Sequence, residues 1–148
     1  MLEQEFERLY YRFRLLHYQT MFEQIEEKES RMSATEAFAA EVIHLLDRPT
    51  VKEFADFLHI SQPNATYKIN SLETKGYIRR IPSSEDRREI LLDTTDKFRQ
   101  YYGRNAPFVR KMIAGMKERY SPAELDRIEA LIRQIVDEVL EAPAHRKD

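Results

Sequence analysis

The stretch from Ser61 to Gly76 gathers side chains whose chemistry is hydrogen bonding rather than charge. At helical spacing, one face of this stretch carries short amides and hydroxyls with one aromatic ring, namely Asn64, Thr66, Tyr67, Asn70, Ser71 and Thr74. A solvated helix face usually carries Glu and Lys instead. Uncharged donors and acceptors suit a surface that reads base edges, where they carry the sequence information. The alternative interpretation is an ordinary polar surface helix.

The same stretch holds the signals that form and position such a helix. Ser61 is a good N-cap, because its hydroxyl satisfies an orphan N–H of the first turn, and Pro63 falls inside that turn at little cost. Gly76 stands where a helix ends in a left-handed residue. An apolar stripe at i, i+4 and i+7 supplies the buried side and consists of Ala65, Ile69 and Leu72.

The flanking segments complete a recognisable unit. Thr50 and Glu53 form a capping box that predicts a helix over 51–58, with Val51, Phe54, Ala55 and Leu58 as its inner face. Only His59 and Ile60 separate it from Ser61, so the two helices form a helix-turn-helix. Residues 77–81 and 89–92 are β-prone around a turn at 82–86, and the tip of this predicted hairpin has Arg79, Arg80, Arg87 and Arg88 nearby. A helix-turn-helix followed by a basic hairpin is a winged helix.

Composition sets limits on the class of protein. The chain has 148 residues, 42% hydrophobic and 34% charged, which fits one helix-rich globular domain. No apolar run approaches the roughly 18 residues that span a bilayer, and Glu3, Glu5 and Glu7 interrupt any signal-peptide core. The absence of Cys excludes disulfides and Cys-ligated zinc. We therefore expect a cytoplasmic protein with no membrane segment.

Charge is distributed unevenly along the chain. The net charge of −2 does not indicate a nucleic-acid binder. Between Ser61 and Leu92, however, six basic residues face four acidic ones. This local excess is small, but it lies on the segment that would meet phosphates.

The remaining segments are predicted to be helical and to pack against other helices. The first helix is expected over 2–27, with apolar residues at a/d spacing, and the second over 33–46, with Phe38, Val42, Leu45 and Leu46 on its apolar side. A further helix begins after Thr94 or Thr95, and Gly103 with Pro107 predicts a break near Asn105. Helices over 108–120 and 122–140 complete the chain, the last one started by a cap at Ser121.

This order of elements resembles the multiple-antibiotic-resistance-regulator (MarR) family of bacterial transcription factors. The resemblance rests on the helix start TVKEFA at 50–55, on the block LETKGYI at 72–78 and on the wing SEDRR at 84–88, followed by TTDK at 94–97. The motifs cover roughly residues 50–97, and the helical layout extends the resemblance to nearly the whole chain. Phe98 departs from the family, which often has Gly there.

The resemblance implies a mainly α fold: a winged helix-turn-helix lobe over 33–97, and a helical dimerisation region from residues 1–32 and 98–148. It implies a homodimer on double-stranded DNA, with recognition helices in major grooves of a pseudo-palindromic operator and wings in minor grooves. Asp86 would then brace the hairpin so that Arg88 reaches a narrow minor groove; the alternative is an exposed ion pair of little worth. We assign the DNA contacts to Ser61, Gln62, Asn64, Thr66, Tyr67, Asn70, Lys75, Arg79, Arg80, Asp86, Arg87 and Arg88.

By this resemblance, a small aromatic or anionic effector is expected in a cleft between the dimerisation helices and the DNA-binding lobe. The residues expected to line such a cleft here are Phe13, His17, Phe38, Tyr101 and Phe108. The alternative, of at least equal weight, is that these aromatic residues are plain core. The function implied is a transcriptional regulator, most simply a repressor that an effector releases.

The sequence also bears on two other classes of function. A winged helix that docks a protein and binds no specific DNA is compatible with the mild local charge. An enzyme is not expected, because the chain lacks a Gly-rich phosphate loop and a nucleophile elbow. Glu41 and His44 have a spacing that suits a metal, but they lack further ligands, so we expect no metal and no cofactor.

Overall fold

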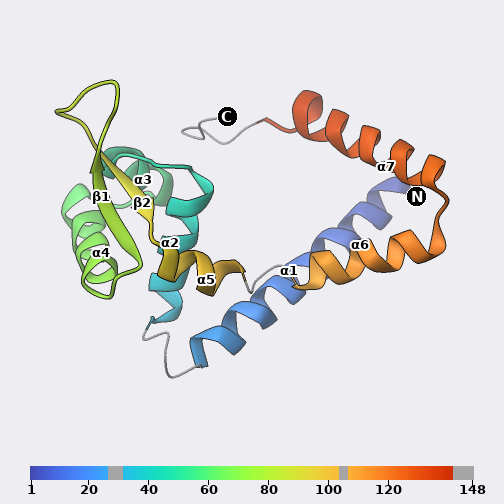
Figure 1. The fold of residues 1–148 in the computed structure, drawn as a ribbon, viewed down its shortest axis with the longest axis horizontal. Helices are drawn as coiled ribbons and strands as arrows, with labels where there is room; N and C mark the ends of the chain where they lie inside the picture. The colour runs from blue at the N-terminus through green and yellow to red at the C-terminus, as the bar shows by residue number, and fades with distance from the viewer. Residues whose placement is uncertain (27–31, 104–106, 142–148) are drawn as a thin grey trace. The chain divides into compact units, whose positions relative to one another are not determined.

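The structure is a computed structural model that describes residues 1–26, 32–103 and 107–141. In chain order its elements are α1 (Leu2–Glu26), α2 (Ala34–Leu45), α3 (Val51–Leu58), α4 (Gln62–Thr74), β1 (Ile78–Pro82), β2 (Ile90–Thr94), α5 (Asp96–Gly103), α6 (Pro107–Arg119), α7 (Pro122–Gln134) and a π-helical turn, η1 (Ile135–Val139) (Figure 1). Contacts divide these elements into two units, the first with α1 to α5 and the hairpin, the second with α6, α7 and η1. Each unit is described by itself.

The helices begin at the predicted caps. The capping boxes Ser33–Glu36 and Thr50–Glu53 are both formed. In each, the hydroxyl oxygen of the serine or threonine accepts the backbone N–H of the glutamate, and the glutamate carboxylate accepts the backbone N–H of the serine or threonine. Ser121 and Glu124 form a third box, at the start of α7. These reciprocal bonds satisfy donors that a helix start leaves unpaired, so the predicted helix starts are confirmed.

The core of the first unit lies inside the winged helix-turn-helix. The inner stripe of α4 is fully buried, as predicted, with Ala65, Ile69 and Leu72 at 0% exposure. They pack with Phe54 and Ala55 of α3 and with apolar residues of α2, the hairpin and α5. The helix-turn-helix is therefore held together by the residues that the apolar spacing identified.

A Schellman motif connects α4 to the hairpin. Gly76 has a φ of 81°, and its N–H bonds to the Glu73 carbonyl while the Tyr77 N–H bonds to the Leu72 carbonyl. These two bonds cap the last carbonyls of α4 and turn the chain into β1. Because Tyr77 completes this cap and is buried, the strand begins one residue later than predicted.

The hairpin pairs β1 with β2 in antiparallel register, from Ile78 opposite Thr94 to Pro82 opposite Ile90. The second strand runs to Thr94 instead of the predicted Leu92. This register places Arg79 and Arg80 on β1, within the predicted strand and along the hairpin. An isolated bridge from Thr50 to Leu91 attaches the start of α3 to the outer side of β2.

The inner face of α2 differs from the prediction. Phe38 and Leu45 are 38% and 52% exposed, whereas small residues and one isoleucine are buried: Ala37, Ala39, Ala40 and Ile43. Alanine side chains are small and allow neighbouring backbones to approach closely. The prediction was wrong because it took the largest apolar side chains as the inner face of α2. Leu46 is buried as expected, just beyond the helix end.

Helix α5 extends the core. The Thr95 hydroxyl accepts the Phe98 N–H at 3.3 Å, which confirms one of the two caps proposed for this helix. Phe98 is fully buried and stacks on Tyr102, with ring centroids 5.4 Å apart. The side chain that departs from the family is thus a core residue. The predicted break near Asn105 lies outside the described residues.

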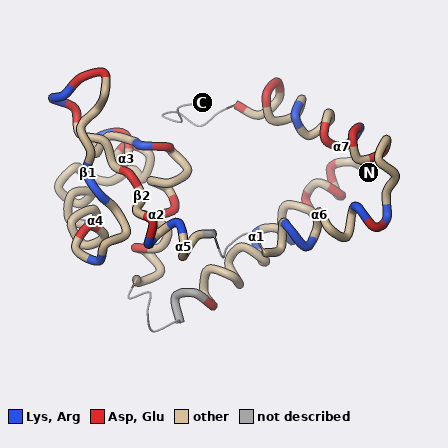
Figure 2. Tube along the Cα trace, viewed as in Figure 1, with Lys and Arg blue, Asp and Glu red and all other residues tan. Residues whose placement is uncertain are grey.

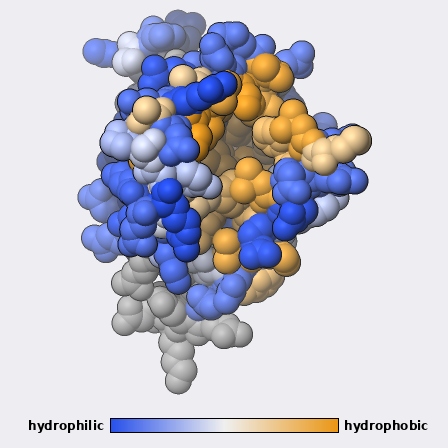
Figure 3. Space-filling model, turned by 90° about the vertical axis from the view of Figure 1, so that its right-hand side faces the viewer, coloured by the Kyte–Doolittle hydropathy of each residue, from blue (hydrophilic) through white to orange (hydrophobic). Residues whose placement is uncertain are grey.

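The terminal helices carry apolar side chains that the single chain does not cover. In α1, Phe6 is 48% exposed, and in α7, Ile132 is 55% exposed with Leu131 and Val136 beside it also exposed. Hydrophobic side chains are visible among hydrophilic ones on the face in Figure 3. Phe13, Ile128 and Ile135 are half-buried. Over the part of the chain that the structure describes, no helix combines the length and hydropathy that a bilayer crossing requires.

Candidate nucleic-acid interface

The predicted polar face of α4 is presented to solvent. The Ser61 hydroxyl accepts the Asn64 N–H at 3.3 Å, which fixes the start of the helix. Gln62, Asn64 and Asn70 are exposed, Thr66 is half-buried and Tyr67 is 75% exposed. Asn64, Tyr67 and Asn70 therefore lie on the side of α4 away from its buried stripe, Thr66 lies at the edge of the stripe, and Gln62 is exposed at the start of the helix.

The turn before α4 fixes its angle to α3. His59 has a φ of 53°, a left-handed conformation uncommon for a residue with a side chain. The Ile60 N–H bonds back to the Ala55 carbonyl at 3.0 Å, and Ile60 packs against the core. The short connection of a helix-turn-helix is thus formed without glycine.

Lys75 is engaged inside the protein. Its ammonium donates to both oxygens of Glu36 on α2, at 2.8 and 2.7 Å, and the Ser71 hydroxyl donates to the same carboxylate at 2.6 Å. Burial would raise the pKa of Glu36, but the hydrogen bonds from Lys75, Ser71 and Ser33 outweigh it and lower the pKa to about 2. Lys75 was predicted to face a phosphate, and that assignment remains a prediction.

Arg80 and Arg79 are engaged as well. Arg80 donates to Glu73 and, at 2.7 Å, to the Asn70 side-chain oxygen, so β1 is tied to α4 through two predicted DNA contacts. Arg79 pairs with Asp93 across the hairpin at 2.8 Å. Glu36, Glu73 and Asp93 were not predicted as partners, because such pairs join segments distant in sequence. Of these three carboxylates, the sequence indicated a role only for Glu36, as part of a capping box.

The wing tip holds two exposed arginines. Arg87 and Arg88 are exposed, and in the described part of the chain neither makes an ion pair. The Asp86 carboxylate accepts the Arg88 backbone N–H at 2.9 Å, and the Ser83 hydroxyl accepts the N–H groups of Glu85 and Asp86. The loop is thus built by its own side chains and carries charges of both signs (Figure 2).

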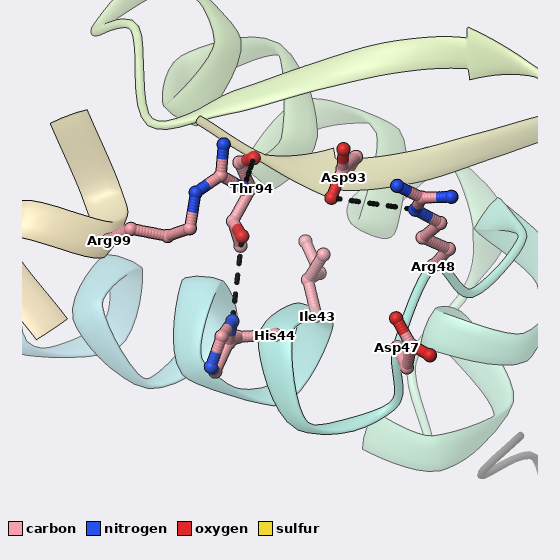
Figure 4. Close-up of a pocket in the computed structure, with 7 residues that line it drawn as sticks. All are labelled: Ile43, His44, Asp47, Arg48, Asp93, Thr94 and Arg99. Atoms are coloured by element: carbon pink, nitrogen blue, oxygen red, sulfur yellow. Dashed lines mark hydrogen bonds and ion pairs between the residues drawn. The ribbon is translucent and has the colours of Figure 1, made fainter. Parts of the chain in front are cut away.

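A polar cavity of about 200 Å³ lies at the base of the wing. None of the predicted site residues lines it; its lining is Ile43, His44, Asp47, Arg48, Asp93, Thr94 and Arg99 (Figure 4). His44 faces Thr94, with 3.5 Å between the ring Nδ1 and the hydroxyl, while Arg48 lies toward Asp93. Asp47 and Arg48 are both left-handed, with φ of 51° and 59°. Oppositely charged side chains close to one another line this cavity.

The residues predicted to line an effector cleft fall into both units. His17 on α1 lies 3.3 Å from Glu41 on α2, and the ring of Tyr18 meets that of Phe38 edge to face. Tyr101 packs against Phe98, and Phe13 is half-buried on α1. Phe108 belongs to the second unit. Convergence of the five side chains therefore stays a prediction.

The two spaced residues considered for a metal have protein partners instead. Glu41 pairs with His17, and burial raises the pKa of this carboxyl against the lowering effects of His17 and Tyr102. His44 lies against Thr94 and the rings of Phe98 and Tyr102. Among the described residues, no three metal-ligating side chains come together.

Comparison with known proteins agrees with this geometry. Residues 32–90 match the family model described as "MarR family". The uncharacterized HTH-type transcriptional regulator YkoM of Bacillus subtilis is 26% identical over 109 residues, which cover 74% of this chain and 71% of that protein.

Two solved structures share the fold. The Streptococcus pneumoniae protein FabT, solved in complex with DNA, has a TM-score of 0.57 at 22% identity, covering 92% of this chain and 95% of FabT. Transcriptional regulator Tm0710 of Thermotoga maritima has a TM-score of 0.66 at 16% identity, covering 91% and 94%. The winged-helix fold predicted from the sequence is confirmed, and the match at residues 32–90 agrees with the family resemblance found there. Residues 32–90 of this chain carry the sequence pattern of the MarR family, and the chain is similar to that family over this segment.

Proposed function

We propose that this protein is a sequence-specific, cytoplasmic DNA-binding repressor that acts as a homodimer on a pseudo-palindromic operator. The observation that carries the proposal is the exposed face of α4, where Gln62, Asn64, Tyr67 and Asn70 offer uncharged hydrogen-bonding groups. Asn and Gln form paired hydrogen bonds with adenine in the major groove, so this face suits direct readout.

The wing supplies the second contact. Arg87 and Arg88 are exposed at its tip, and arginine inserted into a narrow minor groove gains from the enhanced negative potential there. Arg79 and Arg80 would contribute to the positive potential along the strand, although each also has a carboxylate partner. FabT, which shares the fold, was solved in complex with DNA.

Exposed apolar side chains on the terminal helices support the proposed homodimer. Phe6, Ile132 and Val136 expose large apolar surfaces in the single chain. A second copy would cover such surfaces, and two-fold symmetry in the protein would be matched by symmetry in the operator. A small aromatic or anionic effector that binds beside α1 would relieve repression by favouring one spacing of the two recognition helices.

The alternative function is a winged-helix module that docks a protein. The two functions differ in their response to salt, because phosphate contacts release counterions and give a steep, linear dependence of log affinity on log salt. A docked peptide does not generally show this steep slope.

The test is selection of duplexes from the host's genomic DNA by the purified full-length protein, followed by fluorescence anisotropy. The selected duplex should share a pseudo-palindromic sequence, bind more tightly than a scrambled duplex, and weaken steeply with salt. Absence of enrichment, or equal affinity for the selected and scrambled duplexes, would contradict specific binding.

A further inference from the structure

Glu36 joins two helices through a saturated set of hydrogen bonds. Its carboxylate accepts the Ser33 N–H at 2.8 Å within its own capping box on α2. It also accepts the Ser71 hydroxyl and the Lys75 ammonium, which lie one turn apart at the end of α4. Both oxygens therefore bond to α4 or to the start of α2, so one residue fixes the end of the recognition helix to α2.

We propose that Glu36 is a positioning residue that sets the orientation of the recognition helix, and that Lys75 serves as its anchor rather than as a phosphate contact. This inference rests on the proposed function of α4 in reading DNA. Asn64 lies seven residues from Ser71, a separation of about 10 Å along a helix that rises 1.5 Å per residue. A tilt of about 10° at the anchored end would displace Asn64 by roughly 2 Å, more than a hydrogen bond tolerates.

The environment of the pair supports this role. The side chains of Glu36 and Lys75 are only 14% and 31% exposed, unlike the flexible ion pairs of a protein surface. The pKa of Glu36 is lowered to about 2, so the carboxylate is ionised throughout the pH range in which DNA binding is measured. Lys97 on α5 donates to the Lys75 carbonyl at 2.8 Å, which adds a second anchor at the same end of α4.

The competing interpretation is that Lys75 binds a DNA phosphate and that Glu36 merely occupies it in the free protein. The two interpretations predict opposite effects when the carboxylate is neutralised. If Glu36 is an anchor, neutralising it weakens binding to the selected duplex, because base reading is impaired. If Lys75 is a phosphate contact, neutralising Glu36 frees Lys75, so binding to any duplex is unchanged or improves.

The experiment compares Glu36→Gln, Lys75→Met and the double variant with Glu124→Gln as matched control. Glutamine at this position of a capping box still caps the helix, so Glu36→Gln removes charge without removing the cap. Glu124 closes the equivalent box on α7, in the other unit from α4. The probes are a duplex selected by the wild-type protein and a scrambled duplex of the same composition.

For a positioning role, Glu36→Gln and Lys75→Met each weaken binding to the selected duplex about tenfold, as loss of a hydrogen bond to a charged group predicts. Binding to the scrambled duplex should change less than about twofold, the double variant should be no worse than either single, and Glu124→Gln should match wild type. The inference is overturned if Glu36→Gln leaves both affinities unchanged or higher while Lys75→Met lowers both.

A measurement without DNA separates this inference from the proposed function. Amide hydrogen exchange should accelerate over 71–76 in Glu36→Gln and not in Glu124→Gln, because the end of α4 loses its anchor. Unchanged exchange at these amides would overturn the positioning role, whether or not the protein binds DNA. If exchange accelerates while the wild-type protein selects no duplex, the anchor stands and the DNA-reading function fails.

Discussion

The carboxylate of Asp86 holds Arg88 by its backbone, accepting the main-chain N–H at 2.9 Å. A bond from an Asp side chain to the N–H two residues on closes an Asx turn. The acid therefore shapes the wing loop, and the guanidinium remains without an ion pair in the described part of the protein. The family resemblance implies that Asp86 braces the hairpin for Arg88. In the structure, the Asp86 carboxylate is bonded to the backbone of Arg88.

This geometry predicts a graded series of wing variants. Asp86→Asn keeps a side-chain oxygen that accepts the Arg88 N–H, so affinity for the selected duplex should stay near the wild-type value. Asp86→Ala removes the acceptor and should weaken binding by loosening the turn. Arg88→Ala should lower affinity mainly on duplexes with A·T-rich flanks, where the minor groove is narrow. Anisotropy titrations on duplexes with A·T-rich and G·C-rich flanks measure the difference.

The ion-pair alternative predicts another order for the same series. If Asp86 acted by its charge on the Arg88 side chain, the Asn and Ala variants would be equally impaired. Equal loss in both variants would therefore contradict the Asx-turn role.

Asn64 should determine sequence preference rather than general affinity. Replacing it by alanine removes a donor and an acceptor from the exposed face of α4, and should cost about 1–3 kcal/mol on the selected duplex. The cost on scrambled DNA should be much smaller. Gln100→Ala removes an exposed amide from α5 and is the matched control. Equal losses on both duplexes would show that Asn64 does not read bases.

Local signals in the sequence predicted most of the lobe correctly. Ser61, Pro63 and Gly76 delimit α4 through capping chemistry that acts within one turn, and the stripe of Ala65, Ile69 and Leu72 needed only helical spacing. The positive φ of Gly76 likewise follows from a local cap. Such features depend on neighbours in sequence, and this is why a single chain reveals them.

Partners distant in sequence could not be predicted in the same way. The attraction of Lys75 to Glu36 and of Arg79 to Asp93 depends on how α2, α4 and the hairpin pack. From the sequence, Lys75 and Arg79 were predicted to contact phosphates because their carboxylate partners could not be identified. The inner face of α2 failed for a related reason, because close helix packing favoured alanines over Phe38 and Leu45.

His44 should make the fold less stable in mild acid. Burial and nearby Arg99 lower its pKa below the ordinary 6.5, against the raising effects of Asp47 and Asp93. The unfolded chain therefore takes up the proton first, and the contribution of the neutral ring, fully present above pH 6.5, is lost as pH falls through the lower folded value. His44→Gln should show a smaller drop in Tm between pH 7.5 and 5.5 than wild type. An identical drop in both proteins would refute this linkage.

Ile132 should be essential for assembly. It is 55% exposed on α7, next to the exposed Leu131, and a dimer partner would cover it. Ile132→Glu would place an unpaired carboxylate in that apolar seam, at a cost of several kcal/mol. We expect light scattering to show a dimer for wild type and a monomer for the variant at micromolar concentration, with specific DNA binding lost as well.

The control for this substitution is Gln134→Glu, which adds the same charge two residues further along α7. Residues two apart on a helix point to nearly opposite sides, so this carboxylate should stay in water and leave the dimer intact. A monomer from both variants would indicate general electrostatic repulsion between copies instead of a buried seam at Ile132. A dimer from Ile132→Glu, or a stable wild-type monomer, would place the association surface elsewhere and remove the support that the exposed terminal helices give to two-fold binding of an operator.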